Sequence, residues 1–117
     1  MLQERYYGPD HVEVATTLNN LGSAYGSLGD HAKERDLLER ALVIRERYYG
    51  PDHVEVAVTL NNLGSAYGSL GDHAKERDLL ERALVIMERY YGPDHVEVPT
   101  TLNNLGRAHD VMTLWGD

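Results

Sequence analysis

The dominant feature of this sequence is an internal duplication, in which residues 8–49 and residues 50–91 are nearly the same. Over these 42 aligned positions only two pairs differ, namely Thr16 against Val58 and Arg45 against Met87. A unit of this length cannot bury its own apolar face and must stack on its neighbours. The duplication therefore predicts an elongated array of repeats rather than a domain built around one central core.

The rest of the chain follows the same repeat. The 117 residues are interpreted as one array of four segments: residues 1–7 are the tail of a truncated repeat, 8–49 and 50–91 are full repeats, and 92–117 are a partial repeat with a divergent C-terminal tail. Because both ends fall inside a repeat, we expect a piece cut from, or engineered after, a longer array.

The composition indicates which classes of partner the protein binds and in which cellular compartment we expect it. The formal net charge of −8 argues against a nucleic-acid surface or an anionic membrane surface. The sequence contains no Cys, which excludes disulfides and thiolate metal sites. It has no apolar run long enough to span a bilayer and no signal segment at the front. We therefore expect a cytoplasmic location, without membrane or nucleic-acid binding.

The second copy shows where the first helix of a repeat begins and what ends the helix before it. Gly50 and Pro51 stop the preceding helix, because Gly supplies the backbone that closes a helix and Pro cannot continue it. Asp52 has Glu55 three residues later, which predicts a capping box at the start of a new helix. Apolar residues then recur at steps of three and four, which predicts one buried stripe: Val56, Leu60, Leu63, Ala66, Tyr67 and Leu70.

A second helix completes the unit. Gly71 ends the first helix and Asp72 is placed to cap the next. Its apolar stripe is wider, and its other face is charged and predicted to be a solvated outer surface. The stripe comprises Leu79, Leu80, Ala83, Leu84, Ile86, Met87, Tyr90 and Tyr91. The two tyrosine pairs, one at the end of each full repeat, are predicted to pack between repeats. No alternating strand pattern occurs, so each repeat is predicted to be a helical hairpin in an all-α fold.

This pattern resembles the tetratricopeptide repeat (TPR) family. The matching residues are Leu60, Leu63, Gly64, Tyr67, Ala83 and Pro93. The usual repeat has about 34 residues, and the longer unit here adds about one turn to each helix. The LNNLG and GPDH segments are similar to the repeats of kinesin light chains and related bacterial proteins. The resemblance implies an α-solenoid of antiparallel helix hairpins that forms a right-handed superhelix.

One position departs from the family pattern. Where its second helix usually has a small Ala, this chain has Glu34 and Glu76. We expect these carboxylates either to lean into solvent or to pair with an Arg. Gly64 matches the family glycine that lets two helices approach closely, whereas Gly68 is expected to leave the inner groove shallow.

The resemblance also implies a binding surface. First helices of the family line a concave face along which extended peptides lie. The candidate peptide-binding residues on that face are Asn19, Asn20, Ser23, Asn61, Asn62, Ser65, Asn103, Asn104 and Arg107. Asn suits this role because its amide pairs with the N–H and C=O groups of a peptide backbone. The resemblance favours the second Asn of each pair as the ligand contact. The alternative is that one Asn of each pair bonds to the neighbouring repeat.

The sequence gives little support for metal binding or for catalysis. No two of the histidines His11, His31, His53, His73, His95 and His109 have the helical spacing of a metal site with a third ligand nearby, so metal-assisted chemistry is the weakest hypothesis. The serines lie in a helical pattern without a base and an orienting acid beside them. We therefore predict no metal, no cofactor and no enzyme activity. The groove carries no Lys or Arg before Arg107, so acidic C-termini are not expected ligands.

Two functions remain. The first is a scaffold that binds a peptide or partner protein on its concave face. The second is a structural array whose main property is stacking and self-association. The last copy has an apolar stripe without a second helix to cover it, which favours a homo-oligomer through the incomplete terminal repeats. A tail that folds back over this stripe is the competing outcome.

Overall fold

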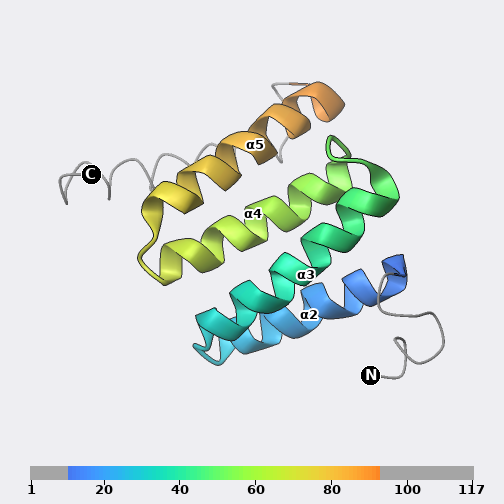
Figure 1. The fold of residues 1–117 in the computed structure, drawn as a ribbon. Coiled ribbons are helices and arrows are strands. Elements are labelled where there is room, and N and C mark those ends of the chain that lie inside the picture. The colour runs from blue at the N-terminus through green and yellow to red at the C-terminus, as the bar shows by residue number, and fades with distance from the viewer. Residues whose placement is uncertain (1–10, 93–117) are drawn as a thin grey trace.

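The computed structural model describes residues 11–92, and this part of the chain consists of helices joined by short turns. Its helices are α2 (Val12–Ser27), α3 (His31–Tyr49), α4 (Val54–Ser69) and α5 (His73–Tyr91). Figure 1 shows them side by side in chain order, so that the hairpin of α2 and α3 stacks on the hairpin of α4 and α5. No strand occurs between residues 11 and 92. The predicted all-α stack of helix hairpins is confirmed.

The second helix of each repeat begins at an aspartate, as predicted. The side chain of Asp72 accepts a hydrogen bond from the backbone N–H of Lys75 at 3.2 Å. Asp30 does the same for Lys33 at 3.1 Å. A carboxylate at this position satisfies a backbone donor that has no partner within the helix, and it complements the positive end of the helix dipole.

The first helix of each repeat begins one residue later than predicted, and its cap is a histidine. The imidazole Nδ1 of His53 accepts from the backbone N–H of Glu55 at 3.0 Å, and His11 makes the same bond to Glu13. The predicted capping box starting at Asp52 is therefore wrong. His53 has the extended backbone of a capping residue (φ −80°, ψ 148°), while Asp52 lies in the preceding turn.

Glycines end the second helices by adopting a backbone that other residues avoid. Gly50 follows α3 with φ +92° and ψ 157°, and its N–H donates to the carbonyl of Glu46 at 3.0 Å. A side chain is strained in this region of backbone space. The predicted stop at Gly50 is confirmed, and with it the sharp turn that sends α4 back along α3.

The apolar core consists of two clusters that overlap between repeats. The first lies between α2 and α3 and contains Val14, Ala15, Leu18, Leu37, Ala41 and Ile44. The second lies mainly between α4 and α5, but it also includes Leu38 from the preceding hairpin. The repeats therefore bury apolar surface against each other as well as within each hairpin, as expected of a stacked array.

Equivalent residues are more buried in α4 than in α2. Leu63 is 2% exposed and Ala66 is 1% exposed, whereas Leu21 is half-buried and Ala24 is exposed. The sequences of the two helices are almost identical, so the difference comes from their surroundings. Helix α4 packs against both α3 and α5, whereas among the described helices α2 packs mainly against α3.

Helices α4 and α5 approach each other closely at Gly64. A Cβ atom at this position would lie 3.2 Å from Cγ of Leu80 and 3.4 Å from the backbone oxygen of Glu76. Gly22 has the equivalent surroundings in the first hairpin. The prediction that this glycine allows the helices of a hairpin to pack closely is confirmed.

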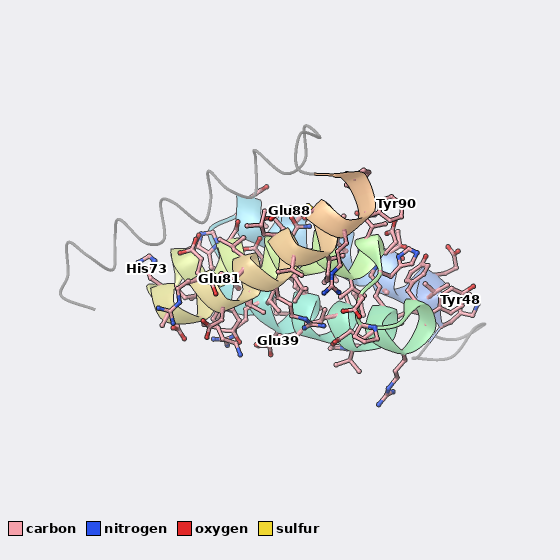
Figure 2. All side chains as sticks on the ribbon, turned by 90° about the horizontal axis from the view of Figure 1, so that it is seen from above. Glu39, Tyr48, His73, Glu81, Glu88 and Tyr90 are labelled. Carbon is pink, nitrogen blue, oxygen red and sulfur yellow. The ribbon has the colours of Figure 1, made fainter. Side chains whose placement is uncertain are left out.

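The tyrosine pairs only partly follow the prediction. The ring of Tyr49 stacks on His53 of the next repeat, with centroids 4.4 Å apart, so this residue does pack between repeats. Tyr48 and Tyr90, however, are each 64% exposed. Figure 2 shows both at one side of the molecule, opposite His73. The apolar stripe of the second helix therefore ends before its first tyrosine.

Candidate functional site

The first helices carry an exposed polar stripe, which we name the first-helix face. Its residues recur at steps of three and four, and this spacing places them on one side of a helix. They are Glu13, Thr16, Asn20, Ser23 and Ser27 on α2, and Glu55, Val58, Asn62, Ser65 and Ser69 on α4. All five residues on α2 are exposed, while Glu55 and Asn62 on α4 are half-buried.

The predicted site residues fall on or beside this face. Asn20, Ser23 and Ser65 are exposed, and the half-buried ones are Asn19, Asn61 and Asn62. Asn103, Asn104 and Arg107 lie outside the described residues, as do the terminal segments expected to drive self-association. The structure therefore brings together the candidate residues of two successive repeats, and their contact with a peptide stays a prediction.

A hydrogen bond between asparagines joins the two first helices. Nδ2 of Asn62 on α4 donates to Oδ1 of Asn19 on α2 at 3.4 Å. This is the bond between repeats that the structural alternative expected. An Asn amide has two N–H donors, so the bond leaves Asn62 a second donor as well as its carbonyl oxygen. The bond links α2 to α4 and orients the amide of Asn62.

Asn61 occupies the same position in the second repeat as Asn19 in the first. Its Oδ1 atom is buried and accepts no hydrogen bond within the described part of the chain. In the first repeat the equivalent oxygen accepts from an Asn of the next copy. Buried polar atoms normally have a partner, so Asn61 Oδ1 differs in this respect from its equivalent in the first repeat.

The first-helix face has no positive charge within α2 and α4. These two helices contain no Lys or Arg, and their only charged side chains are Glu13 and Glu55, which lie in the first turns. The remaining residues of the face are Asn, Ser, Thr and Val. In this part of the array the surface is therefore neutral along most of its length and negative at one end.

The space beside Gly68 is filled by Glu76, which corrects the expectation for this carboxylate. A Cβ atom on Gly68 would collide with the Glu76 carboxylate. The Glu76 side chain is 13% exposed, and its Oε1 lies 3.0 Å from Nδ1 of His73. It therefore neither leans into solvent nor pairs with an Arg. A His three residues before it in the helix supplies a closer partner, and Glu34 repeats the arrangement with His31.

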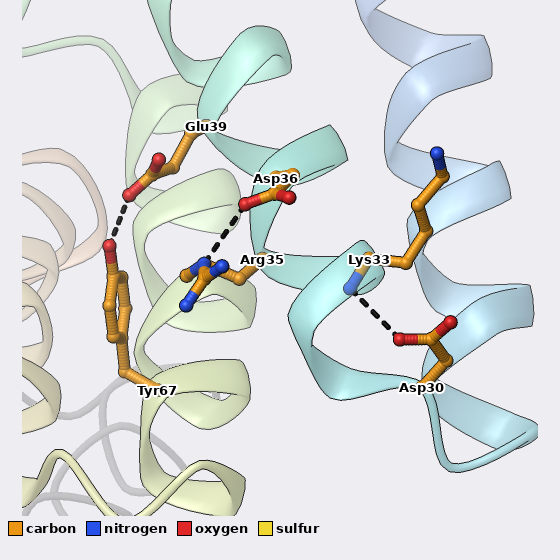
Figure 3. A network of polar contacts seen from close by, with 6 residues as sticks. All are labelled: Asp30, Lys33, Arg35, Asp36, Glu39 and Tyr67. Carbon is orange, nitrogen blue, oxygen red and sulfur yellow. Dashed lines mark hydrogen bonds and ion pairs between the residues drawn. The ribbon is translucent and has the colours of Figure 1, made fainter.

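Tyr67 on α4 also connects the second repeat to the first. Its hydroxyl donates to the carboxylate of Glu39 on the preceding α3, as drawn in Figure 3. Burial, together with the hydrogen bond to Glu39, raises the pKa of the Tyr67 phenol to about 12. Arg35, which bonds to Asp36 one residue later, lies near this pair. Sequence reasoning placed Tyr67 in the apolar stripe and missed the role of its hydroxyl.

Two arginines also join successive repeats. Arg82 on α5 donates to Oε2 of Glu46 on α3 at 2.7 Å and to the carbonyl of Pro51 at 3.4 Å. Arg45 is 6% exposed and donates to the hydroxyl of Thr59 at 2.8 Å. The partners are 36 and 14 residues apart in sequence. No local sequence pattern indicates such pairs, because they depend on how one hairpin packs against the next.

The histidines have local partners. Among residues 11–92 no three His, Cys, Asp or Glu side chains form a group able to hold a metal ion. His11 and His53 cap helices, while His31 and His73 lie beside glutamates. Within the same residues, no helix combines the length and the apolar character needed to cross a bilayer.

The fold and the repeated first-helix face define a class of protein, the α-solenoids built from stacked helix hairpins. Residues 2–46 and 28–88 match the family model described as tetratricopeptide repeat. The chain therefore belongs to the tetratricopeptide repeat family. Repeats of this family generally serve as scaffolds for protein interaction, and their fold is typically non-enzymatic. None of the curated proteins matches the sequence.

Solved structures support the same assignment. BtubC (BKLC) from P. vanneervenii is similar over 92% of this chain and 43% of its own, with 26% identity and a TM-score of 0.84. A Podosopora anserina protein named as a putative kinesin light chain with nearly identical TPR-like repeats has 20% identity and a TM-score of 0.78, covering 89% of this chain and 49% of its own. A variant of that protein with one substitution has 21% identity and a TM-score of 0.77 over 92% of this chain and 51% of its own. The chain thus spans about half the length of these proteins. The resemblance to kinesin light chain-like repeats is confirmed.

Proposed function

We propose that the first-helix face binds an extended, neutral or basic peptide segment of a partner protein. The observation that carries this proposal is the set of Asn, Ser and Thr side chains, exposed except for the half-buried Asn62, on the first-helix faces of α2 and α4. An extended peptide leaves many of its backbone N–H and C=O groups unpaired, and it needs partners of both kinds. The Asn amides of the face offer both.

The amide of Asn62 is oriented by its bond to Asn19 before any ligand arrives. A side chain that is already ordered loses less conformational entropy on binding. Asn20 is exposed at the equivalent position of the first repeat. Successive repeats therefore offer one amide each along the path of a peptide. Such contacts hold the peptide backbone and read little of its side-chain identity.

The charges of the face select the type of peptide. An acidic segment would meet Glu13 and Glu55 without any cation on α2 or α4 to balance it. Like charges that face each other across an interface oppose binding. A segment with a Lys or Arg near the first turns of these helices would gain favourable pairs instead. Because the chain has a net charge of −8 and no Cys, we expect this binding in the cytoplasm and not on nucleic acid or a membrane.

The proposal is tested by selecting random decapeptides on the immobilised protein and measuring binding of the enriched sequences by fluorescence anisotropy. We expect enriched peptides to be poor in Asp and Glu. Replacing Asn20, Asn62 and Asn104 with Ala should abolish their binding while leaving the helical circular dichroism intact. The matched control replaces Val43 and Val85, exposed residues of α3 and α5, with Ala and should bind like the parent.

Two results would count against the proposal. If the triple Asn variant unfolds, these residues serve to hold repeats together. If it stays folded and binds the peptides as well as the parent does, the ligand lies on another surface.

Self-association is the second candidate function. Contacts between the two described repeats use residues that both copies carry, such as Tyr67 with Glu39 and Arg82 with Glu46. The same side chains therefore suit a contact between two chains that stack end to end, which is a heterologous interface. Light scattering over a range of protein concentrations tests this function, because a mass that stays monomeric at high concentration excludes it.

A further inference from the structure

The first-helix face is the same in the two full copies except at one residue. Thr16 on α2 corresponds to Val58 on α4. The partial copy carries Thr100 at this position, which lies outside the described residues. Among the three copies in the sequence, Val58 is therefore the one apolar residue at this position of the repeat.

Val58 is exposed and is not part of the core. It is 37% exposed, and it belongs to neither of the two apolar clusters among the described residues. The other difference between the copies is buried, because Arg45 is 6% exposed and Met87 is 2% exposed. Single exposed apolar side chains are common on protein surfaces, but this one replaces a polar residue on the face proposed to bind a peptide. Core packing therefore gives no reason for the valine.

Val58 lies between two groups that the proposed function uses. Glu55 is three residues before it and Asn62 is four residues after it, on the same face of α4. At 1.5 Å per residue these are separations of about 4.5 and about 6 Å along the helix axis. A peptide residue whose backbone is held by Asn62 is thus close enough to place its side chain against Val58. A neighbouring Lys or Arg is close enough to meet the carboxylate of Glu55.

A face made of identical units would hold a peptide in several registers. Side chains of α2 and α4 meet at Asn19 and Asn62, and helices in contact lie about 8–10 Å apart. An extended chain advances about 3.3 Å per residue. A peptide on this face could therefore slide by about three residues and meet the same Asn and Ser side chains again. Only a position at which the repeats differ favours one register over the others.

We propose that Val58 sets the register of the bound peptide by contacting an aliphatic side chain, an inference that rests on the proposed function. An aliphatic side chain over Val58 removes apolar surface from water. The same side chain over Thr16 would cover a hydroxyl, and covering a polar group without a hydrogen bond costs free energy. The favoured peptide therefore carries an aliphatic residue where it crosses α4, with a Lys or Arg beside it, and a polar residue where it crosses α2.

Parallel selection of random decapeptides on the full chain tests this inference. The parent, Val58→Thr and Thr16→Val are immobilised, and the sequences enriched on each are compared. We expect peptides enriched on the parent to share one aliphatic position next to a basic residue. Val58→Thr should lose this preference, whereas Thr16→Val should gain a second aliphatic position about three residues away. The matched control is Val85→Thr, the same exchange at a valine of α5 that is 49% exposed, and it should select like the parent.

Affinities measured by fluorescence anisotropy quantify the effect. One peptide enriched on the parent is compared with a version in which Ser replaces its aliphatic residue. The parent should bind the first peptide about fourfold more tightly, which is the effect of burying one methylene group. Val58→Thr should bind the two peptides nearly alike, and Val85→Thr should keep the fourfold ratio. Circular dichroism checks that the variants fold like the parent, which we expect because Val and Thr are both β-branched.

Failure of this inference and failure of the proposed function give different results. The inference alone is overturned if Val58→Thr keeps the aliphatic preference, if Val85→Thr loses it as well, or if the parent's peptides show none. Loss of binding in the triple variant of Asn20, Asn62 and Asn104 would then still support the first-helix face as the binding site. If no peptide is enriched, or if the triple variant binds the peptides as the parent does, the proposed function fails and the inference fails with it.

Discussion

Tyr67 on α4 donates a hydrogen bond to the carboxylate of Glu39 on the preceding helix α3 and so ties one repeat to the next. The equivalent tyrosine of the first repeat, Tyr25, has no such acceptor among the described residues, although both rings have a Lys ammonium 5.9 Å from their centroids, Lys33 at Tyr25 and Lys75 at Tyr67. Two residues of identical local sequence thus have different partners. This difference provides an internal control for the energy of the contact.

Removing the Tyr67 hydroxyl should weaken the stack. We expect Tyr67→Phe to lower the free energy of unfolding by about 1 kcal/mol, the typical net value of a hydrogen bond. The change is measured by urea denaturation followed by circular dichroism. Tyr25→Phe should change the free energy much less. Equal effects of the two substitutions would mean that losing the hydroxyl costs the same with and without the Glu39 acceptor, so that this hydrogen bond adds nothing measurable.

The same pair predicts a stability change at high pH. The Tyr67 phenol has a pKa of about 12 in the folded protein, above the ordinary tyrosine value of 10.0. Between these values the unfolded chain loses the proton that the folded chain keeps. The contribution of this tyrosine is therefore complete below pH 10 and is lost as the pH rises through 12.

Tyrosinate absorbance during an alkaline titration measures this directly. The parent should show a titration step near pH 12, and Tyr67→Phe should remove that step. Tyr25→Phe should leave it in place. A titration in which the parent and Tyr67→Phe differ only by an ordinary tyrosine would contradict the assignment.

The sequence predicts those features of the structure that depend on residues close together in the chain. The hairpins, the stop at Gly50, the cap at Asp72 and the close approach at Gly64 all depend on residues near in sequence or on a family pattern. Each is found as predicted. The Asp52 capping box failed because both Asp52 and His53 can cap a helix, and only the backbone conformation decides between them.

Contacts between repeats were beyond prediction from the local pattern. The Tyr67–Glu39 and Arg82–Glu46 pairs require the offset of one hairpin against the next, which depends on packing of the whole array. The position of Glu76 depends on whether the space beside Gly68 lies open to a carboxylate. For the binding face, the sequence indicated which Asn and Ser residues lie together and offered a bond between repeats as an alternative, but it did not say that Asn62 and Asn19 are the partners.

The glycines of α4 should differ in their tolerance of a methyl group. Gly64→Ala would press a Cβ against Leu80 and the backbone of Glu76, so α4 and α5 must separate. We expect a loss of about 1–3 kcal/mol for such overpacking, reduced by the better helix propensity of Ala. Gly68→Ala meets only the flexible end of the Glu76 side chain, which can swing away.

Urea denaturation of both variants distinguishes these cases. Gly68→Ala should remain close to the parent in stability, because the helix gains propensity while the His73–Glu76 pair is lost. Gly64→Ala should be clearly the less stable of the two. If both substitutions stabilise the protein, helix packing at Gly64 is looser than the structure indicates.

The two differences between the full repeats suggest a last experiment, at Arg45. This residue is 6% exposed and bonds to the hydroxyl of Thr59, which is 0% exposed, whereas the equivalent residue of the next repeat is Met87. Replacing a buried charge with an apolar side chain of similar volume is often neutral or stabilising. The Thr59 hydroxyl would still donate to the carbonyl of Glu55 at 3.3 Å. We therefore expect Arg45→Met to be as stable as the parent or more so.

Thr59→Val should have the opposite effect in the parent, because it leaves the Arg45 guanidinium without this acceptor in a buried position. We expect a loss of about 1–3 kcal/mol in the free energy of unfolding. The same substitution made together with Arg45→Met should cost much less, since the unpaired charge is no longer present. A double-mutant cycle from the four urea denaturation curves measures this coupling. Additive effects would show that Arg45 and Thr59 do not depend on each other. Such a result would mean that the Arg45 side chain is in contact with water, and it would contradict its buried position between the repeats.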